Sequence, residues 1–592
     1  MTTFEVWAPD LQRVRLRALD SDHEMAPTDD GVWRVTVPDT GRGTDYAFLL
    51  GDDDTPLPDP RSRWQPDGVH APSRLYDSAA YDWKDDAWTG RQLAGSVLYE
   101  LHIGTFTPEG TFAAAVDRLD HLTALGVDLI EVMPVNAVNG THNWGYDGVA
   151  WYAVHEPYGG PDGFKQFVDA CHQHGIGVVL DVVYNHLGPS GAYLPRFGPY
   201  LKAGRNTWGD LLNLDGPRSP RVRRFVLDNA LMWLREFHVD GLRLDAVHAL
   251  VDLGATHLLE ELAAEVDALS AHVRRPLALI AESDQNDPRL VRSRDAGGYG
   301  LTAQWDDDVH HSLHALLTGE RHGYYADFGS LATLAAAFTG AFVHAGTFST
   351  FRGRVHGRPV DPAATPAYRF VAFLQDHDQV GNRAVGDRLS CEPGALSPAL
   401  LKVGAGLLLT SPFTPMLWMG EEWGAATPWQ FFTSHPEPEL GASIAAGRRE
   451  EFAEHGWADV EVPDPQDPET FRRSKLDWSE VDGEPHAELL DWYRRLIALR
   501  RQRPELSDPR LDLVEVAYDE DARWLVVTRC GLRVAVNLAG ERQALPLDGS
   551  PIGVLVASAP GFVYRDGSIE LEAESLAVVE LAPRPASSST AG

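Results

Sequence analysis

Four apolar runs in this sequence end in carboxyl side chains, which are rarely buried unless they are paired or take part in chemistry. Two carboxyl groups suffice for retaining glycoside hydrolysis, one as the nucleophile and one as the acid, roughly 5–5.5 Å apart. Neighbouring parallel strands deliver side chains at about that spacing. The pattern therefore predicts cleavage of a glycosidic bond. The four carboxyl residues are Asp181, Asp245, Glu282 and Asp378.

The position of Arg243 predicts which of these carboxyl groups is the nucleophile and which is the acid. It precedes Asp245 by two residues, so both side chains point to the same face of a strand, and the guanidinium would hold Asp245 as an anion. Glu282 follows the apolar run LALIA near other negative charges, and both effects raise a carboxyl pKa, as an acid requires. Asp378 is then free to stabilise an oxocarbenium-like transition state. The alternative, a purely structural salt-bridge network, would leave three carboxylates for one cation.

Eight apolar runs and the amphipathic segments between them predict an α/β fold, a (β/α)8 TIM barrel. Active sites of such barrels lie at the C-terminal ends of the strands, where the polar residues occur. The segment 111–126 is predicted as one helix, and residues 488–506 as the helix that closes the barrel. The eight predicted strands lie within 96–103, 127–135, 176–185, 240–247, 277–283, 301–307, 369–378 and 414–422.

Short strands separated by Gly, Asp and Pro clusters flank the barrel on both sides. Residues 1–90 predict an N-terminal β-sandwich domain, immunoglobulin-like and similar to carbohydrate-binding modules. The catalytic barrel would span 91–506, with loop insertions after the third and sixth strands. A C-terminal β-sandwich domain is predicted at 507–583 and a disordered tail at 584–592.

Composition narrows the possible partners. The 592 residues carry 51 Lys and Arg against 86 Asp and Glu, a net charge of −35, so nucleic acid and anionic membranes are disfavoured and a neutral substrate is expected. Three widely spaced cysteines, Cys171, Cys391 and Cys530, argue against a disulfide framework and a structural zinc site. Because there is no signal-like start and no run of about 20 apolar residues, a cytoplasmic location is expected.

Four motifs together resemble the conserved regions of the α-amylase superfamily, glycoside hydrolase family 13, in the family's order. They are DVVYNH (181–186), GLRLDAVH (241–248), ALIAES (278–283) and FLQDHD (373–378). The resemblance implies that Asp245 is the nucleophile, Glu282 the general acid/base and Asp378 the transition-state stabiliser. It also implies that Tyr146, in NWGYDG (143–148), forms an aromatic platform under the sugar, although a packing role is the alternative. Further implied substrate contacts are His186, Arg243, His248 and His377.

Additional segments resemble a trehalose-releasing branch of the superfamily. These are residues 131–149, 304–325, 373–389 and 416–435. The resemblance implies hydrolysis of the α-1,4 bond next to the terminal α,α-1,1-linked trehalose of a maltooligosyltrehalose, with release of trehalose and a maltooligosaccharide. It also implies substrate contacts near the cleaved bond from Asp307, Asp308, His310, His311, Gln379 and Asn382. Asp306 and Asp376 stand where the family often has Asn, which affects fine substrate contacts only.

Two alternative functions stay open at this point. A glycogen debranching or branching enzyme of the same superfamily can also carry an N-terminal β-sandwich. A non-catalytic glucan-binding protein on the same barrel is the more remote alternative, because all three implied carboxylates are present. No cofactor and no metal are expected, since the first strand ends in Leu101-His102-Ile103 and lacks the paired histidines of zinc-dependent barrel hydrolases. The sequence does not predict an oligomeric state.

Overall fold

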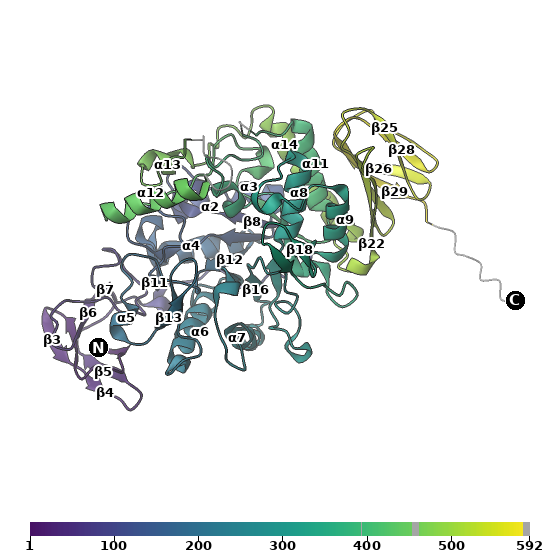
Figure 1. Cartoon of the computed structure of the whole chain (residues 1–592). Helices are drawn as coiled ribbons and strands as arrows, with labels where there is room; N and C mark the ends of the chain where they lie inside the picture. Colours follow the sequence, from purple (N-terminus) through teal and green to yellow (C-terminus); the bar gives the residue numbers. More distant parts are fainter. Residues whose placement is uncertain (392–393, 453–460, 584–592) are drawn as a thin grey trace.

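The computed structural model describes residues 1–391, 394–452 and 461–583. A closed barrel lies at the centre, and smaller antiparallel sheets lie at its two sides (Figure 1). The N-terminal sheets, purple in Figure 1, and the C-terminal sheets, yellow, are on opposite sides of the barrel. The tail predicted to be disordered, 584–592, falls outside the described residues.

Two small antiparallel sheets form the N-terminal part of the chain, in the strand orders β1-β5-β4 and β3-β2-β6-β7. Their apolar side chains alternate along the strands, and Phe4 of one sheet packs on Tyr46 of the other with ring centroids 4.9 Å apart. This is the predicted sandwich arrangement. The strands are β1 Thr2–Trp7, β2 Val14–Ala18, β3 Ser21–Glu24, β4 Ala26–Pro27, β5 Val32–Val37, β6 Asp45–Leu50 and β7 Ser73–Arg74.

The eight predicted barrel strands are confirmed, because each predicted segment contains one strand of the closed, parallel barrel. All of their residues are buried, as expected for strands covered by side chains inside and helices outside. In barrel order they are β8 Leu98–Leu101, β9 Leu129–Val132, β12 Gly177–Val182, β15 Gly241–Leu244, β16 Ala278–Ala281, β17 Ala303–Trp305, β20 Phe370–Phe373 and β21 Thr414–Trp418.

The helices around the barrel follow the predicted pattern with one correction. The segment 111–126 is not one helix but two, α2 Phe112–Val116 and α3 Leu119–Leu125, with a break at Asp117 and Arg118. The break places Phe112 against Phe164 of the next helix, 5.2 Å away, while Leu119 and Leu122 stay in the core. The other long helices are α4 Gly160–Gln173, α6 Ser219–Glu236, α7 Leu258–Val273, α8 Asp307–Thr318, α9 Leu331–Gly340, α11 Pro398–Thr410, α12 Pro438–Phe452 and α14 His486–Gln502.

Loops between strands and helices carry small elements of their own. The insertions predicted after the third and sixth barrel strands contain antiparallel hairpins, and a further pair follows the second strand. These pairs are β13 Leu201–Arg205 with β14 Asp210–Leu212, β18 Thr347–Ser349 with β19 Arg354–His356, and β10 Asn136–Ala137 with β11 Ala150–Val154. Four short helices complete the loops: α1 Ile103–Phe106, α5 Leu194–Phe197, α10 His377–Gly381 and α13 Pro468–Arg473.

A five-stranded and a three-stranded antiparallel sheet enclose a separate apolar core at the C-terminal side. The sequence predicted short strands of a β-sandwich in this region. The strands of the smaller sheet are only three or four residues long. The larger sheet comprises β22 Val514–Asp519, β23 Trp524–Arg529, β24 Leu532–Asn537, β29 Ser575–Leu581 and β26 Pro551–Ala557, and the smaller β25 Gln543–Pro546, β28 Ser568–Leu571 and β27 Val563–Arg565.

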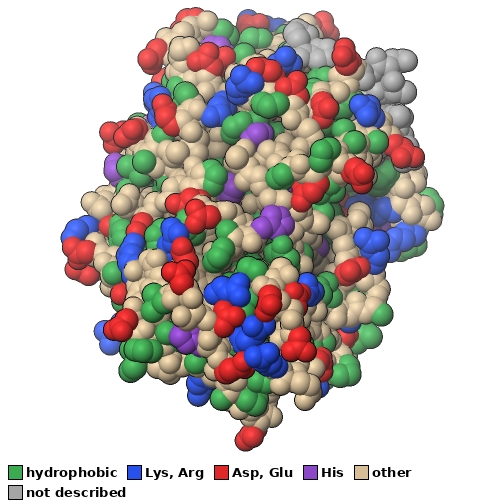
Figure 2. All heavy atoms as spheres, turned by 90° about the vertical axis from the view of Figure 1, so that its left-hand side faces the viewer, with side chains coloured by type: hydrophobic (Ala, Val, Ile, Leu, Met, Phe, Trp, Pro, Cys, Tyr) green, Lys and Arg blue, Asp and Glu red, His purple; other side chains and the backbone are tan. Residues whose placement is uncertain are grey.

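Acidic and basic side chains are interspersed on the face of the molecule in Figure 2, where small basic groups are flanked by acidic ones. Several histidine side chains lie near the middle of this face. In the described part of the chain, no helix combines the length and the apolar character that a membrane span needs.

A buried histidine fastens the connecting segment between the N-terminal sheets and the barrel. His172 of α4 contacts Asp85 of the connector at 2.8 Å and Asp240, just before β15, at 2.9 Å. Trp88 stacks on the His172 ring with centroids 4.5 Å apart. Burial lowers the pKa of His172, but the two carboxylates outweigh it, so the net direction is upward. The histidine is therefore held as a cation between two anions.

We expect His172→Gln to lower stability by about 2–4 kcal/mol near pH 6, because it removes the cation between Asp240 and Asp85 and leaves Asp85 paired with His238 alone. The raised pKa makes this stabilisation fully present below the unfolded pKa of about 6.5 and lost as pH rises through the folded value. Thermal unfolding of both proteins between pH 5.5 and 9 should show a Tm difference that shrinks with pH. His272→Gln, at an exposed position of α7, is the control. A Tm difference independent of pH would contradict the charged state.

Candidate active site

Each predicted carboxyl group lies at the same rim of the barrel, since parallel strands present their carboxyl ends on one side. Asp245 follows the last residue of β15, and Glu282 follows the last residue of β16. Asp378 lies in the first turn of α10, the short helix just after β20. The fold therefore brings together the three residues that the sequence singled out.

Arg243 is the centre of this group. Its guanidinium is fully buried and lies over the ring of Trp305, 4.4 Å from the centroid. Nη1 contacts both carboxylate oxygens of Asp181 at 3.0 and 2.9 Å and donates to Oδ1 of Asp245 at 2.7 Å. Nη2 lies 3.7 Å from Oε2 of Glu282. One cation thus contacts carboxyl groups from three neighbouring strands.

Asp245 is held by a second donor that the sequence analysis did not assign. Nδ2 of Asn185 donates to Oδ2 of Asp245 at 2.6 Å and to its backbone oxygen at 3.0 Å. The side chain stays 14% exposed. Arg243 and Asn185 thus each donate to one of its carboxylate oxygens and fix their positions.

Glu282 has a different environment. Its Oε2 accepts a hydrogen bond from the backbone N–H of Ala246 at 2.5 Å, and Ala246 adopts a left-handed conformation with φ 40°. Burial raises the pKa of Glu282, Arg243 opposes this effect, and Asp245 adds to it. The net direction is upward, so Glu282 keeps a proton to higher pH than an ordinary glutamate.

Asp378 is the most exposed of the three, with 41% of its side chain accessible. Nδ2 of Asn382 donates to its Oδ1 at 3.1 Å, and Nε2 of His377 lies 3.5 Å from its Oδ2. Asp376 caps the start of α10 by accepting from the backbone of Gln379 at 2.7 Å. The cap fixes the short helix and with it the direction of Asp378.

Tyr146 packs against the main core, and its hydroxyl lies between residues from two strand ends. Its hydroxyl donates to Oδ2 of Asp181 at 2.6 Å and lies 2.8 Å from Nε2 of His377. The Tyr146 and His377 rings are stacked, with centroids 5.2 Å apart and an angle of 20°. His186 reaches the same loop, because its Nε2 lies 3.0 Å from the backbone oxygen of Tyr146. Both predicted residues therefore lie at the site.

Trp208, at the tip of the β13–β14 hairpin, is a further candidate that the sequence analysis missed. Its ring lies 6.1 Å from His186 and 6.0 Å from His248, and the residue is 48% exposed. His248, which was predicted, is half-buried and lies near Glu282. An exposed indole beside the site could stack on a sugar ring. Its only sequence signal was a tryptophan in a polar loop, and most tryptophans of a folded chain serve packing instead.

A cavity of about 230 Å³ opens beside Asp378. Asp307 and His311 line it, and because they are four residues apart they share one face of α8. Arg352, which pairs with Asp284 at 2.9 Å, was missed by the sequence analysis because its loop has no recognisable motif. The cavity is lined by Asp284, Asp307, His311, His322, Gly323, Tyr324, Tyr325, Phe351, Arg352, Asp378, Gln379 and Asn382.

The structure corrects the predicted substrate contacts of Asp308 and His310, which lie on other faces of α8. Oδ2 of Asp308 accepts from Nδ2 of Asn286 at 2.9 Å and from the backbone N–H groups of Val343 and His344 at 2.8 and 2.9 Å. These bonds tie α8 to neighbouring loops. Asp308 therefore faces protein rather than the cavity.

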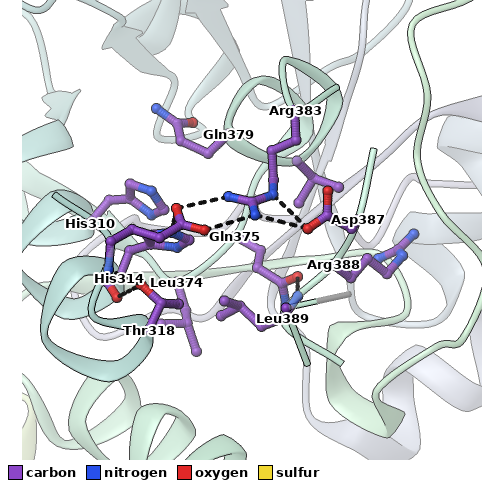
Figure 3. Close-up of a pocket in the computed structure, with 13 residues that line it drawn as sticks. His310, His314, Thr318, Leu374, Gln375, Gln379, Arg383, Asp387, Arg388 and Leu389 are labelled. Atoms are coloured by element: carbon purple, nitrogen blue, oxygen red, sulfur yellow. Dashed lines mark hydrogen bonds and ion pairs between the residues drawn. The ribbon is translucent and has the colours of Figure 1, made fainter. Parts of the chain in front are cut away.

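His310 is fully buried and stacks on Phe373 of β20, 5.3 Å between centroids. Figure 3 shows it beside His314 in a small cavity of about 10 Å³ behind the site wall. There Arg383 bonds the carboxylates of Glu320 and Asp387 at 2.8–3.0 Å. His310 thus supports the wall and does not contact the 230 Å³ cavity.

Among residues 1–391, 394–452 and 461–583 there is no group of three or more His, Cys, Asp or Glu side chains arranged to hold a metal ion. The carboxyl groups at the barrel mouth are instead bonded to Arg243, Asn185 and Asn382.

Known protein families and solved structures resemble this chain in its barrel. Residues 71–199 match the family model described as "Alpha amylase, catalytic domain", and residues 509–578 match a domain of unknown function, DUF3459. A Salmonella typhimurium protein described as an alpha-amylase superimposes with a TM-score of 0.89 at 39% identity, covering 98% of this chain and 97% of that one. A pullulanase from Anoxybacillus, with a TM-score of 0.72 at 18% identity over 98% and 86%, shares the fold. The barrel, the catalytic-domain model and the match to the Salmonella typhimurium protein define a glycosidase of the α-amylase superfamily.

Relatives that match nearly the whole chain indicate a particular family within this superfamily. Proteins named malto-oligosyltrehalose trehalohydrolase from Arthrobacter ramosus and a Rhizobium species are 58% and 55% identical, covering 95% and 97% of this chain and 98% and 97% of theirs. One from Mycobacterium tuberculosis is 54% identical over 98% of this chain and all of its own. The chain belongs to the malto-oligosyltrehalose trehalohydrolase family.

Asp307 and Asp308 lie on different faces of α8, so substitutions at these two positions should affect different properties, substrate binding and stability. Asp308→Ala should destabilise the protein by about 2–4 kcal/mol, since three buried donors lose their acceptor. Asp307→Ala should leave Tm nearly unchanged and raise KM for an α-glucan substrate about tenfold, because Asp307 lines the cavity. Thermal unfolding and steady-state kinetics measure both. The assignment of faces fails if Asp307→Ala is the unstable variant.

Proposed function

We propose that this chain hydrolyses the α-1,4-glucosidic bond next to the terminal trehalose of a maltooligosyltrehalose, releasing trehalose and a shortened maltooligosaccharide. The observation that carries the proposal is identity of 54–58% to trehalohydrolases over 95–98% of the chain. The site supports it, because carboxyl groups with contrasting environments meet at the barrel mouth. Barrels of this class host many activities, so the specificity depends on the relatives rather than on the fold.

Asp245 is the nucleophile in this proposal. Arg243 and Asn185 both donate to its carboxylate, which fixes its direction. Its carboxylate oxygen attacks the anomeric carbon of the glucosyl unit and forms a covalent glycosyl–enzyme ester as the glycosidic C–O bond breaks. A water molecule later cleaves this ester, so the anomeric configuration is retained.

Glu282 acts first as the acid and then as the base. In the first step it gives its proton to the glycosidic oxygen, so trehalose leaves as a neutral alcohol. In the second step the resulting carboxylate takes a proton from the attacking water, which restores the starting state. The raised pKa of Glu282 suits this cycle, because burial keeps the proton on until it is needed.

Asp378 would stabilise the positive charge that develops on the sugar ring between these two steps. Tyr146 would lie under the ring as a platform, since its hydroxyl is fixed by Asp181 and by His377. The 230 Å³ cavity beside Asp378 would take the part of the substrate next to the cleaved bond. Its polar lining of Asp307, His311, Gln379 and Asn382 suits sugar hydroxyl groups.

We also propose a cytoplasmic location. Cys171, Cys391 and Cys530 are free thiols, and two of them are buried. Unpaired cysteines are typical of proteins from reducing compartments. A fusion of the full chain to a fluorescent reporter in its host would test this directly.

The specificity is tested by separating the products formed from maltotriosyltrehalose, with maltopentaose as a parallel substrate of equal length. We expect trehalose and maltotriose from the first and much slower cleavage of the second. Equal cleavage of both substrates at internal bonds, or action on branched glucan alone, would contradict the proposed specificity. The chain would then have another activity of the superfamily with the same catalytic residues. The configuration of the freshly released sugar, followed by NMR, tests retention.

The residue roles are tested by Asp245→Asn and Glu282→Gln. Each variant keeps the size of the side chain and should lose at least about 10³-fold in kcat, since it removes the nucleophile or the transferable proton. Near-normal Tm would show that the fold is intact. An activated substrate whose leaving group needs no proton should restore the first step of Glu282→Gln but not of Asp245→Asn. Substantial activity of either variant on the natural substrate would overturn its assignment.

A further inference from the structure

Glu100, the third residue of β8, contacts His377 through both of its carboxylate oxygens. Oε1 lies 2.5 Å from Nδ1 of the His377 ring, and Oε2 accepts the backbone N–H of His377 at 3.1 Å. Both residues are buried. Glu100 therefore fixes the ring and the backbone of the residue that begins α10, directly before Asp378.

The hydrogen bonds around His377 determine where its protons are. With Glu100 ionised, both of its oxygens accept, so Nδ1 of His377 donates to Oε1 while the backbone N–H donates to Oε2. The Tyr146 hydroxyl gives its single proton to Asp181, so its oxygen accepts from Nε2 of His377 at 2.8 Å. Both ring nitrogens therefore donate, which only the imidazolium form allows.

We propose that Glu100 is a positioning residue that holds His377 as an imidazolium, with its Nε2–H directed between the Tyr146 hydroxyl and the Asp378 carboxylate. Asp378 Oδ2 lies 3.5 Å from Nε2. This inference rests on the proposed function, because it concerns the same site. It assigns a role in that site to a residue on the first barrel strand, far from the other site residues in sequence.

The surroundings agree with this charge state. Burial alone lowers the pKa of His377, but Asp378 and Glu100 outweigh it and raise the pKa to about 10. Without a carboxylate at position 100, burial would oppose the charge with less compensation. The ionisable groups that face His377 from the elements around it are Glu100, His102, Glu131, Tyr146, Asp181, Asp376 and Asp378.

The consequence is a rigid support for the sugar. The imidazolium stacks under Tyr146 at 5.2 Å and donates to its hydroxyl, so the platform cannot turn without breaking a charge-assisted bond. It also places a fixed positive charge beside Asp378. A neutral imidazole would keep only one of its two donors.

Glu100→Gln tests the proposal, and Glu131→Gln is its matched control. Glu131 lies opposite Glu100 in the neighbouring strand, is buried, and has no hydrogen-bond partner for either carboxyl oxygen in the described part of the chain. Burial raises its pKa well above the usual range, so Gln mimics the neutral acid. The readout is the ratio of variant to wild-type kcat/KM at each pH from 5 to 8.5. Ionisable groups that titrate in the same way in both proteins do not change this ratio.

We expect the Glu100→Gln ratio to fall about tenfold or more from pH 5 to pH 8, because a histidine near its ordinary pKa of about 6.5 is mostly neutral at pH 8. The Glu131→Gln ratio should stay constant. In a His377→Gln background, Glu100→Gln should have no further effect on the pH dependence. A constant ratio for Glu100→Gln, or the same fall in the control, would overturn the proposal.

Folding of each variant is checked by Tm and circular dichroism. If Glu100→Gln does not fold, Glu100→Asp replaces it in the same experiment. Asp keeps the anion at a greater distance, so the proposal expects a ratio that falls only slightly with pH, and a fall of about tenfold or more between pH 5 and pH 8 would overturn it. The wild type is first assayed on maltotriosyltrehalose. If it cleaves another α-glucan instead, the proposed function fails while the ratios are still measured on that glucan.

Discussion

The buried guanidinium of Arg243 is the interaction on which the site depends. It contacts Asp181, Asp245 and Glu282, which belong to three neighbouring strands. Buried carboxylates need a cation, and a buried cation needs carboxylates, so neither is stable at the barrel mouth without the other. The register of β12 against β15 places Asp181 opposite Arg243. A shift of this register by one residue would turn the Arg243 side chain toward the helices and break its ion pairs. The ion pairs therefore favour the observed register.

Differences in local environment separate two chemically similar carboxyl groups. Asp245 receives hydrogen bonds from Arg243 and Asn185, whereas Glu282 receives one from a backbone N–H and lies farther from the guanidinium. Burial raises the pKa of Glu282, and although Arg243 opposes this effect, the net direction is upward. A nucleophile and an acid can therefore coexist at one pH, as the proposed mechanism requires.

A chain of hydrogen bonds extends this arrangement across the barrel. It runs from Glu100 through His377 and Tyr146 to Asp181 and Arg243, and so connects the first and seventh strands with the third and fourth. The sugar platform and the carboxyl groups are therefore positioned by one network. Behind it, His310 of α8 and the ion pairs of Arg383 in Figure 3 support the wall of the site without contacting the 230 Å³ cavity.

The sequence by itself determined the eight barrel strands, the presence of β-sheet regions on both sides of the barrel and the residues of the proposed mechanism. These follow from local patterns: apolar runs mark strands, and side chains two apart share a face, which paired Arg243 with Asp245. Only the tertiary structure decided which face of α8 meets the cavity, so that Asp307 and His311 line it whereas Asp308 and His310 do not. It also decided that Glu100 meets His377 and that Asn185 meets Asp245. Closure of the barrel creates these contacts between residues that are far apart in the chain. The local spacing of apolar and polar residues therefore cannot predict them.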